Sequence, residues 1–130
     1  MPHIHEKIDF TVEVFVVYRN KVLLRMHDKY KIWLSVGGHI ELDEDPNEAA
    51  LREVKEEVGL DVTLASDLKT SETITEGYKE LIPPKFLNIH AINTSHRHIS
   101  LVYFARAETD RVQPEKPTDE WRWVTKEELT

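Results

Sequence analysis

Apolar and polar residues alternate along the chain in a pattern that predicts a β-rich fold containing one well-marked helix. Residues 8–18 (IDFTVEVFVVY) are rich in β-branched and aromatic residues, and residues 21–26 (KVLLRM) resume the apolar run after a two-residue break, which predicts a β-hairpin. Further strands are predicted at residues 60–64, which can extend toward Thr73, and at residues 86–92, 99–107 and 119–124. The segment 99–107 is nearly all apolar, so we expect it to lie in the centre of a sheet.

The segment between Asp45 and Gly59 carries the signals that start and stop a helix. Asp45 suits the N-cap, Pro46 suits the first helical position, and Glu48 completes a capping-box pattern. Gly59 suits the position just after the helix, where a left-handed backbone conformation is common. The sequence therefore predicts a helix over residues 46–58.

A helical wheel divides this predicted helix into three sides. With Glu53 at zero, Glu57 falls near 40° and Glu56 near 300°, so the three carboxylates share one sector. A separate apolar stripe between roughly 60° and 160° is expected to pack against a sheet; it contains Ala50, Leu51, Val54 and Val58. Glu48 and Arg52 are four residues apart, and we expect them to form an ion pair behind the carboxylates.

The remaining organisation predicts one domain over residues 1–130. Residues 66–84 form a long polar connection, and connections of this length are often functional. Thr125 and Glu128 form a second capping-box pattern about one turn before the last residue. Either part of a C-terminal helix is missing from this chain or the helix is a short stub.

Composition and charge narrow the function classes. The chain has 130 residues and no cysteine, which excludes a disulfide framework and a thiolate nucleophile or metal ligand. It lacks a signal-peptide pattern and an apolar run of membrane-spanning length, so we expect a soluble protein of the cytoplasm. The net charge of −7 disfavours binding to a nucleic-acid polymer, and eight acidic and two basic residues between Glu41 and Glu57 account for −6 of it.

The clustered glutamates have two interpretations. A solvated charged face is the commoner source of a run of charges. However, such a face gains stability from alternating signs, whereas Glu53, Glu56 and Glu57 repel one another with only Arg52 beside them. Carboxylates at this spacing suit hard divalent cations such as Mg²⁺ or Mn²⁺, which also bind substrate phosphates.

From Gly38 the chain reads GHIELDEDPNEAALREVKEEVGL, which resembles the signature of the Nudix hydrolases, G-x5-E-x7-R-E-U-x-E-E-x-G-U, where U is an apolar aliphatic residue. Every specified position matches: Gly38, Glu44, Arg52, Glu53, Val54, Glu56, Glu57, Gly59 and Leu60. The resemblance implies an α/β fold, a Nudix-type α/β/α sandwich around a mixed β-sheet. It also implies Mg²⁺-dependent hydrolysis of a small-molecule nucleoside diphosphate linked to another moiety.

The resemblance also implies roles for individual residues. Glu53, Glu56 and Glu57 correspond to the metal ligands, and the carbonyl of Gly38 can add another. Arg52 corresponds to the residue that orients these glutamates, while Glu44 supports the loop and helix geometry or a metal-bound water. Many family members have proline immediately before the two glycines, where this chain has Val36, so the substrate subclass stays open.

Candidate substrate contacts are Arg25, His39 and Tyr78. Arg25 lies on a predicted strand where Nudix enzymes can place a phosphate-binding base, and His39 follows Gly38. Tyr78 lies 18 residues beyond Leu60, a spacing that resembles diadenosine polyphosphate hydrolases. The general base is either a glutamate of the signature or one of three in the long connection, Glu72, Glu76 and Glu80.

His96 and His98 share one face of a predicted strand, within reach of a metal or a phosphate. No acid stands at a matching spacing, which favours polar strand-edge residues over ligands. A non-catalytic Nudix-like nucleotide-binding or sensor module is the alternative function, although such modules usually degrade the signature. Family resemblance also suggests a homodimer.

Overall fold

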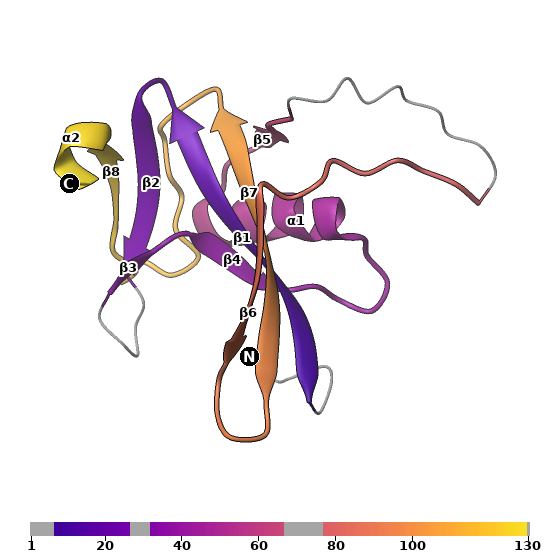
Figure 1. Ribbon diagram of the computed structural model, residues 1–130. Coiled ribbons are helices and arrows are strands. Elements are labelled where there is room, and N and C mark those ends of the chain that lie inside the picture. The colour runs from indigo at the N-terminus through magenta and orange to yellow at the C-terminus, as the bar shows by residue number, and fades with distance from the viewer. Residues whose placement is uncertain (1–6, 27–31, 67–76, 130) are drawn as a thin grey trace.

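The computed structural model describes all residues except 1–6, 27–31, 67–76 and 130. The described chain contains strands and helices in this order: β1 (Ile8–Tyr18), β2 (Lys21–Met26), β3 (Trp33–Leu34), β4 (Val36–His39), α1 (Pro46–Val58), β5 (Val62–Leu64), β6 (Phe86–Ala91), β7 (Arg97–Ala107), β8 (Trp121–Thr125) and α2 (Lys126–Leu129) (Figure 1). Strand β5 ends at Leu64, and the part of its predicted extension beyond residue 66, toward Thr73, lies outside the described residues, as do Glu72 and Glu76.

The strands form one mixed sheet whose centre is the pair β1 and β7. These two strands run parallel in a continuous register from Ile8 opposite Arg97 to Val17 opposite Arg106. The other pairings are antiparallel. Strand β1 pairs with β2 and β4, β2 pairs with β3 and β8, and β7 pairs with β5 and β6. The predicted hairpin, the central position of β7 and the α/β class with a mixed sheet are confirmed.

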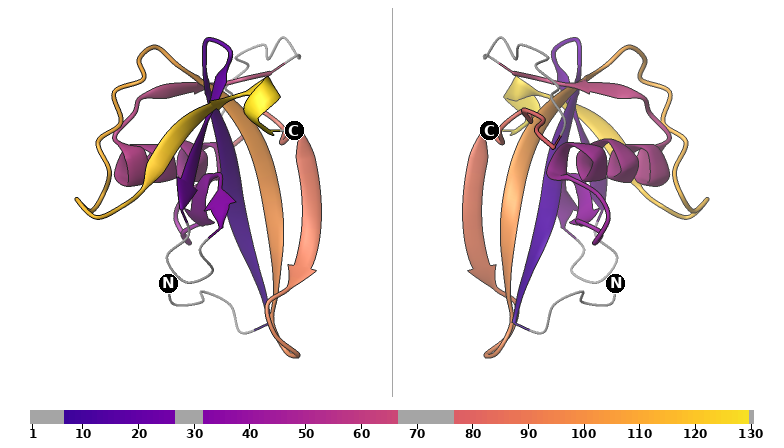
Figure 2. Two further views of the ribbon diagram at one scale, coloured as in Figure 1. Left: turned by 90° about the vertical axis from the view of Figure 1, so that its left-hand side faces the viewer. Right: turned by 90° about the vertical axis from the view of Figure 1, so that its right-hand side faces the viewer.

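Helix α1 lies against one face of the β1 and β7 pair (Figure 2). Its predicted bounds and both predicted caps are confirmed. Asp45 accepts a hydrogen bond from the Glu48 backbone, the Glu48 side chain accepts one from the Asp45 backbone, and Gly59 adopts a left-handed conformation with φ of 70°. These local hydrogen bonds satisfy amide groups that a helix end leaves without partners.

The core lies between α1 and the sheet. Successive side chains of a strand point to opposite faces, so Val12, Val14 and Val16 of β1 face the helix together with Tyr103 of β7. The alternate residues face the other way, and there Thr11 hydrogen-bonds Ser100 across the parallel pair at 2.8 Å. The sheet thus has an apolar face under α1 and a polar region on its reverse.

Two expectations about α1 were wrong. Leu51 is 41% exposed rather than packed, whereas Glu53 is only 5% exposed. The buried arc of the helix therefore includes part of the acidic sector, because the helix approaches the sheet over the glycines of β4. Glu48 also does not pair with Arg52: its carboxylate caps the helix, and the Arg52 guanidinium binds three other acids instead.

The predicted bounds of β1 and β2 are confirmed, whereas one or both ends of β5, β6, β7 and β8 differ from prediction by one or two residues. The second capping box is confirmed, since Thr125 and Glu128 exchange hydrogen bonds at the start of α2. Among the described residues, no helix has the length and apolar character needed to cross a membrane.

Candidate active site

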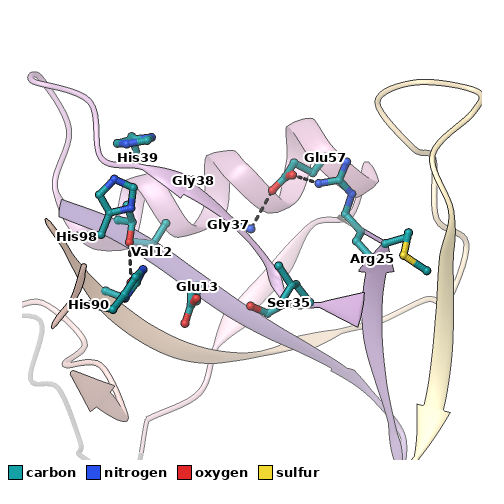
Figure 3. Close-up of a pocket in the computed structure, with 14 residues that line it drawn as sticks. Val12, Glu13, Arg25, Ser35, Gly37, Gly38, His39, Glu57, His90 and His98 are labelled. Atoms are coloured by element: carbon teal, nitrogen blue, oxygen red, sulfur yellow. Dashed lines mark hydrogen bonds and ion pairs between the residues drawn. The ribbon is translucent and has the colours of Figure 1, made fainter. Parts of the chain in front are cut away.

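A pocket of about 470 Å³ connects the acidic side of α1 with the polar reverse of the sheet. Figure 3 shows Glu57 and Arg25 at one end, the imidazoles of His39, His90 and His98 at the other, and the glycines of β4 between them. Strands β1, β2, β4, β6 and β7 and helix α1 all contribute to its lining. The pocket therefore collects residues that are far apart in the sequence.

Arg52 joins the carboxylates at the acidic end. Its guanidinium donates to Glu44 at 2.7 Å and 2.9 Å, to Glu53 at 2.9 Å and to Glu56 at 3.1 Å. A further hydrogen bond, at 2.9 Å, reaches the carbonyl of His39. The planar fork of an arginine can serve several acceptors in fixed directions, which a lysine cannot do. Arg52 thus fixes the helix, the loop before it and the end of β4 relative to one another.

This hydrogen-bond network shifts the pKa values of the side chains that form it. Hydrogen bonds from Arg52 hold the pKa of Glu44 below its ordinary value, and hydrogen bonds to Glu44 raise the pKa of Arg52. Burial raises the pKa of Glu53 despite its contact with Arg52. A buried carboxylate that is costly to ionise gains from a nearby cation. The Glu53 position therefore suits a bound metal ion.

Glu57 occupies the corner between α1 and β4. One carboxylate oxygen accepts a hydrogen bond from the backbone of Gly37 at 2.8 Å, and the other is paired with Arg25. Burial outweighs these favourable contacts and raises the pKa of Glu57 to about 7. Arg25 also reaches Asp119, at 3.4 Å, so this arginine stands between two partly buried acids.

The raised pKa of Glu57 makes the stability of the metal-free protein depend on pH. The folded state binds this proton more tightly than the unfolded state, where the pKa is the ordinary 4.5. Stability therefore falls as the pH rises from about 4.5 to about 7, by at most about 3 kcal/mol from this group. Glutamine at this position cannot ionise. With chelator present, we therefore expect the Tm of Glu57→Gln to exceed that of the wild type, and the difference in Tm to grow as the pH rises over this range. Differential scanning calorimetry checks this, and an unchanging margin would contradict it.

The glycines of β4 let the helix carboxylates approach the strand. A Cβ on Gly38 would stand 2.5 Å from an Oε atom of Glu53, and a Cβ on Gly37 would stand 2.1 Å from the carbonyl oxygen of Val12. Both distances are shorter than any ordinary contact. The absence of side chains at these two positions is what makes room for Glu53 and for the strand pairing beside it.

Substituting Gly38 with alanine is expected to displace the Glu53 carboxylate. Overpacking of this kind typically costs about 1 to 3 kcal/mol, and it would also weaken divalent-cation binding at the acidic end. Thermal unfolding and a Mg²⁺ titration measure the two effects. The Glu53→Ala background provides the control, because the same alanine should destabilise the protein less where the carboxylate is gone. An equal loss in both backgrounds would show that Glu53 is not what the new Cβ meets.

The last turn of α1 is bound to the segment that leads into β8. The backbone amide of Gln113 donates to the Val58 carbonyl at 2.8 Å, and that of Glu115 donates to the Glu57 carbonyl at 3.1 Å. A Cβ on Gly59 would stand 2.7 Å from the Cβ of Gln113. These contacts satisfy carbonyls that a helix C-terminus otherwise leaves to solvent. They also fix the backbone of the helical turn that carries Glu57.

The predicted substrate contacts are distributed unevenly. Arg25 and His39 line the pocket. Tyr78 is 56% exposed, lies outside the pocket lining, and donates a hydrogen bond to Glu80 at 3.3 Å. Glu80 is itself exposed.

Sequence reasoning missed two acids, Asp9 and Asp119. Asp119 contacts Arg25, and Asp9 contacts both His39 and His96. A signal was present for Asp9, because an acid inside a strand rich in apolar residues is unusual. The spacing of the residues could not show which side chains it would meet.

The whole arrangement is a mixed β-sheet covered by helix α1, with acids gathered beside a glycine-containing strand. The family model described as "NUDIX domain" matches residues 9–130. The chain therefore belongs to the NUDIX family, and it is a hydrolase of that family.

Solved structures agree with this assignment. A NUDIX-family hydrolase from Clostridium perfringens is 40% identical, with a TM-score of 0.82 over 93% of this chain and 83% of its own. A MutT NUDIX hydrolase from Burkholderia pseudomallei is 19% identical and shares the fold, with a TM-score of 0.67 over 96% of this chain and 88% of its own. A NUDIX hydrolase from Nitrosomonas europaea, also 19% identical, has a TM-score of 0.64 over 95% of this chain and 61% of its own. No curated protein sequence matches the chain significantly.

Proposed function

We propose that the protein is a Mg²⁺-dependent pyrophosphohydrolase that cleaves the diphosphate linkage of a nucleoside diphosphate joined to another moiety. Dinucleoside polyphosphates and nucleoside triphosphates are representative substrates, and Mn²⁺ is an expected substitute for Mg²⁺. The metal ligands in this proposal are Glu53, Glu56, Glu57 and the carbonyl of Gly38.

The observation that carries the proposal is the gathering of acids around Arg52. A single guanidinium nitrogen lies 2.9 Å from Glu53 and 3.1 Å from Glu56, which brings two of the proposed ligands to one point. Glu53 in turn contacts Glu57, and Gly38 leaves open the space that the Glu53 carboxylate occupies. Oxygen donors of this kind suit a hard divalent cation.

The donor set fits such an ion electrostatically. Burial raises the pKa of both Glu53 and Glu57, so their charges are held at a cost that a cation offsets. When bound, the ion neutralises pyrophosphate charge and activates water. Arg52 holds Glu53 and Glu56 in place, and Glu44 fixes Arg52 from the preceding loop.

The pocket supports binding of a phosphorylated substrate beside these acids. Arg25 lies at the same end as Glu57, and we assign it to a phosphate group of the substrate, with Asp119 holding its other guanidinium nitrogen. His39 follows Gly38 on β4 and is assigned a second phosphate contact. Tyr78 stays a proposed substrate contact, with an exposed ring that lies outside the pocket lining.

A hydrolysis screen tests the proposal. Purified protein is incubated with dinucleoside polyphosphates, nucleoside triphosphates, oxidised nucleotides and nucleotide sugars, with Mg²⁺ and with chelator. We expect cleavage of a diphosphate linkage in at least one class, and only with the metal. Calorimetric binding of a nucleotide with no cleavage in any class would instead favour a non-catalytic binding module.

The proposal also covers the setting in which the enzyme works. Residues 1–130 are taken as one catalytic domain acting on small molecules in the cytoplasm, and the homodimer suggested by family resemblance is checked by light scattering.

A further inference from the structure

The end of the pocket opposite Glu57 contains a second cluster of chemically active side chains. The parallel register of β1 and β7 places Asp9 opposite His98, and the pairing of β1 with β4 brings His39 opposite Thr11, two residues along the same face. Asp9 is only 1% exposed. A carboxylate buried to this degree needs strong partners, and imidazoles surround it.

The distances within this cluster are close to those of a metal centre. One Asp9 oxygen lies 3.4 Å from Nε2 of His39 and 3.1 Å from Nε2 of His96. One potential ligand atom from each of Asp9, His39 and His98 lies within 4.8 Å of the other two. Ligands of tetrahedral Zn²⁺ at 2.0 to 2.1 Å from the ion are about 3.3 Å apart. Small side-chain rotations would bring the three atoms to this separation.

The chemistry of the cluster selects a cation over an anion. A phosphate group would meet the buried charge of Asp9 at its centre, whereas a cation would neutralise it. Nitrogen donors with one carboxylate suit the borderline ions Zn²⁺, Co²⁺ and Ni²⁺, in contrast to the all-oxygen set on α1. Since an ionised carboxylate only accepts hydrogen bonds, His96 donates to Asp9 and fixes its orientation, as a supporting residue commonly does for a metal ligand.

We propose that Asp9, His39 and His98 form a binding site for a transition-metal ion of the Zn²⁺ class, with His96 positioning Asp9. Three protein ligands leave one coordination position, and it faces the pocket because His39 and His98 both line it. In the metal-bound state His39 acts on a phosphate group only through the ion. The site takes no ligand from α1, so it does not rest on the hydrolytic function proposed above.

Cobalt provides a direct test, because Co²⁺ bound by four ligands including nitrogen absorbs visible light far more strongly than Co²⁺ bound by six oxygens. Metal-free protein is titrated with Co²⁺ in excess Mg²⁺, which occupies oxygen-only sites. We expect one equivalent to give the intense spectrum, and Zn²⁺ to displace it. Removing a ligand in His98→Gln should weaken binding by at least ~100-fold, and removing the positioning residue in His96→Gln by about 10- to 100-fold.

Two variants distinguish this site from the acidic end of the pocket and from the neighbouring exposed histidine. Glu57→Gln should keep the intense spectrum, since it alters only the acidic end of the pocket. His90→Gln is the matched control, because His90 is an exposed histidine whose ring lies 5.7 Å from that of His98. Circular dichroism and thermal unfolding without metal confirm that each variant is folded.

The outcomes that would overturn the proposal are specific. A weak six-coordinate spectrum that Mg²⁺ abolishes, equal in the wild type and in His98→Gln, would show that the cluster is a hydrogen-bonded network without an ion. A loss in His90→Gln as large as that in His98→Gln would contradict the assigned ligands.

Discussion

Replacing Glu57 with glutamine is expected to lower Mg²⁺-dependent turnover by about two to three orders of magnitude, the usual size of the effect when one charge-stabilising group is removed from a catalytic site. Glutamine keeps the shape of the side chain and its hydrogen bond from Gly37 but removes the charge that pairs with Arg25 and that we propose for the metal. Because the charged form is costly in the metal-free protein, the fold should survive the substitution intact. Steady-state kinetics on the substrate found in the screen, with Mg²⁺ varied, measures the loss.

The matched control is Glu108→Gln, the same chemical change at an exposed position just after β7. It should leave both turnover and the dependence on Mg²⁺ unchanged. Wild-type turnover in Glu57→Gln would refute the assignment of Glu57 to the metal site. A parallel loss in Glu108→Gln would point instead to a general effect of net charge.

Replacing Arg52 with methionine is expected to cause the largest combined loss of stability and activity. The substitution leaves Glu44, Glu53 and Glu56 without the guanidinium that holds them together. Removing one partner from a buried or half-buried charge network typically costs about 3 kcal/mol or more. Urea unfolding at neutral pH measures this cost, and added Mg²⁺ should restore part of it because the ion replaces some of the lost positive charge.

Two further variants interpret that result. Arg52→Lys keeps the charge but loses the planar fork, so we expect an intermediate stability with little recovery of turnover. Lys55→Met removes an exposed cation from the same helix and should change stability by less than about 1 kcal/mol. If Lys55→Met were as harmful as Arg52→Met, the effect would come from the helix's overall charge rather than from the contacts of Arg52.

The parts of this fold that the sequence predicts are the ones that local contacts determine. Helix α1 begins and ends where expected because its start and stop signals involve only residues one helical turn apart. These signals are Asp45, Pro46 and Glu48 at the start and Gly59 at the end. The three glutamates that we propose as metal ligands are similarly local, since Glu53, Glu56 and Glu57 all lie on α1. For these features, the spacing of residues along the chain is enough to predict their positions in space.

Features that depend on packing or on strand pairing were harder to predict. A helical wheel assigns Leu51 and Glu53 to the inside or outside by hydrophobicity alone. In the structure Glu53 is buried, because Gly38 leaves space for its carboxylate, and Leu51 faces outward. The acid that accompanies His96 and His98 is Asp9, which a parallel pairing brings from the far end of the chain. No spacing rule within one strand could reveal that partner.

The contact between the last turn of α1 and residues 113–115 limits how the protein can be altered. The segment between β7 and β8 has no regular structure, and such surface connections usually accept insertions or changes of length. Here the amides of Gln113 and Glu115 are committed to carbonyls of Val58 and Glu57. An epitope tag or a loop graft is better placed near Glu108, upstream of these hydrogen bonds, than between residues 113 and 119. Between those two positions, a change of loop length would shift the backbone that carries Glu57.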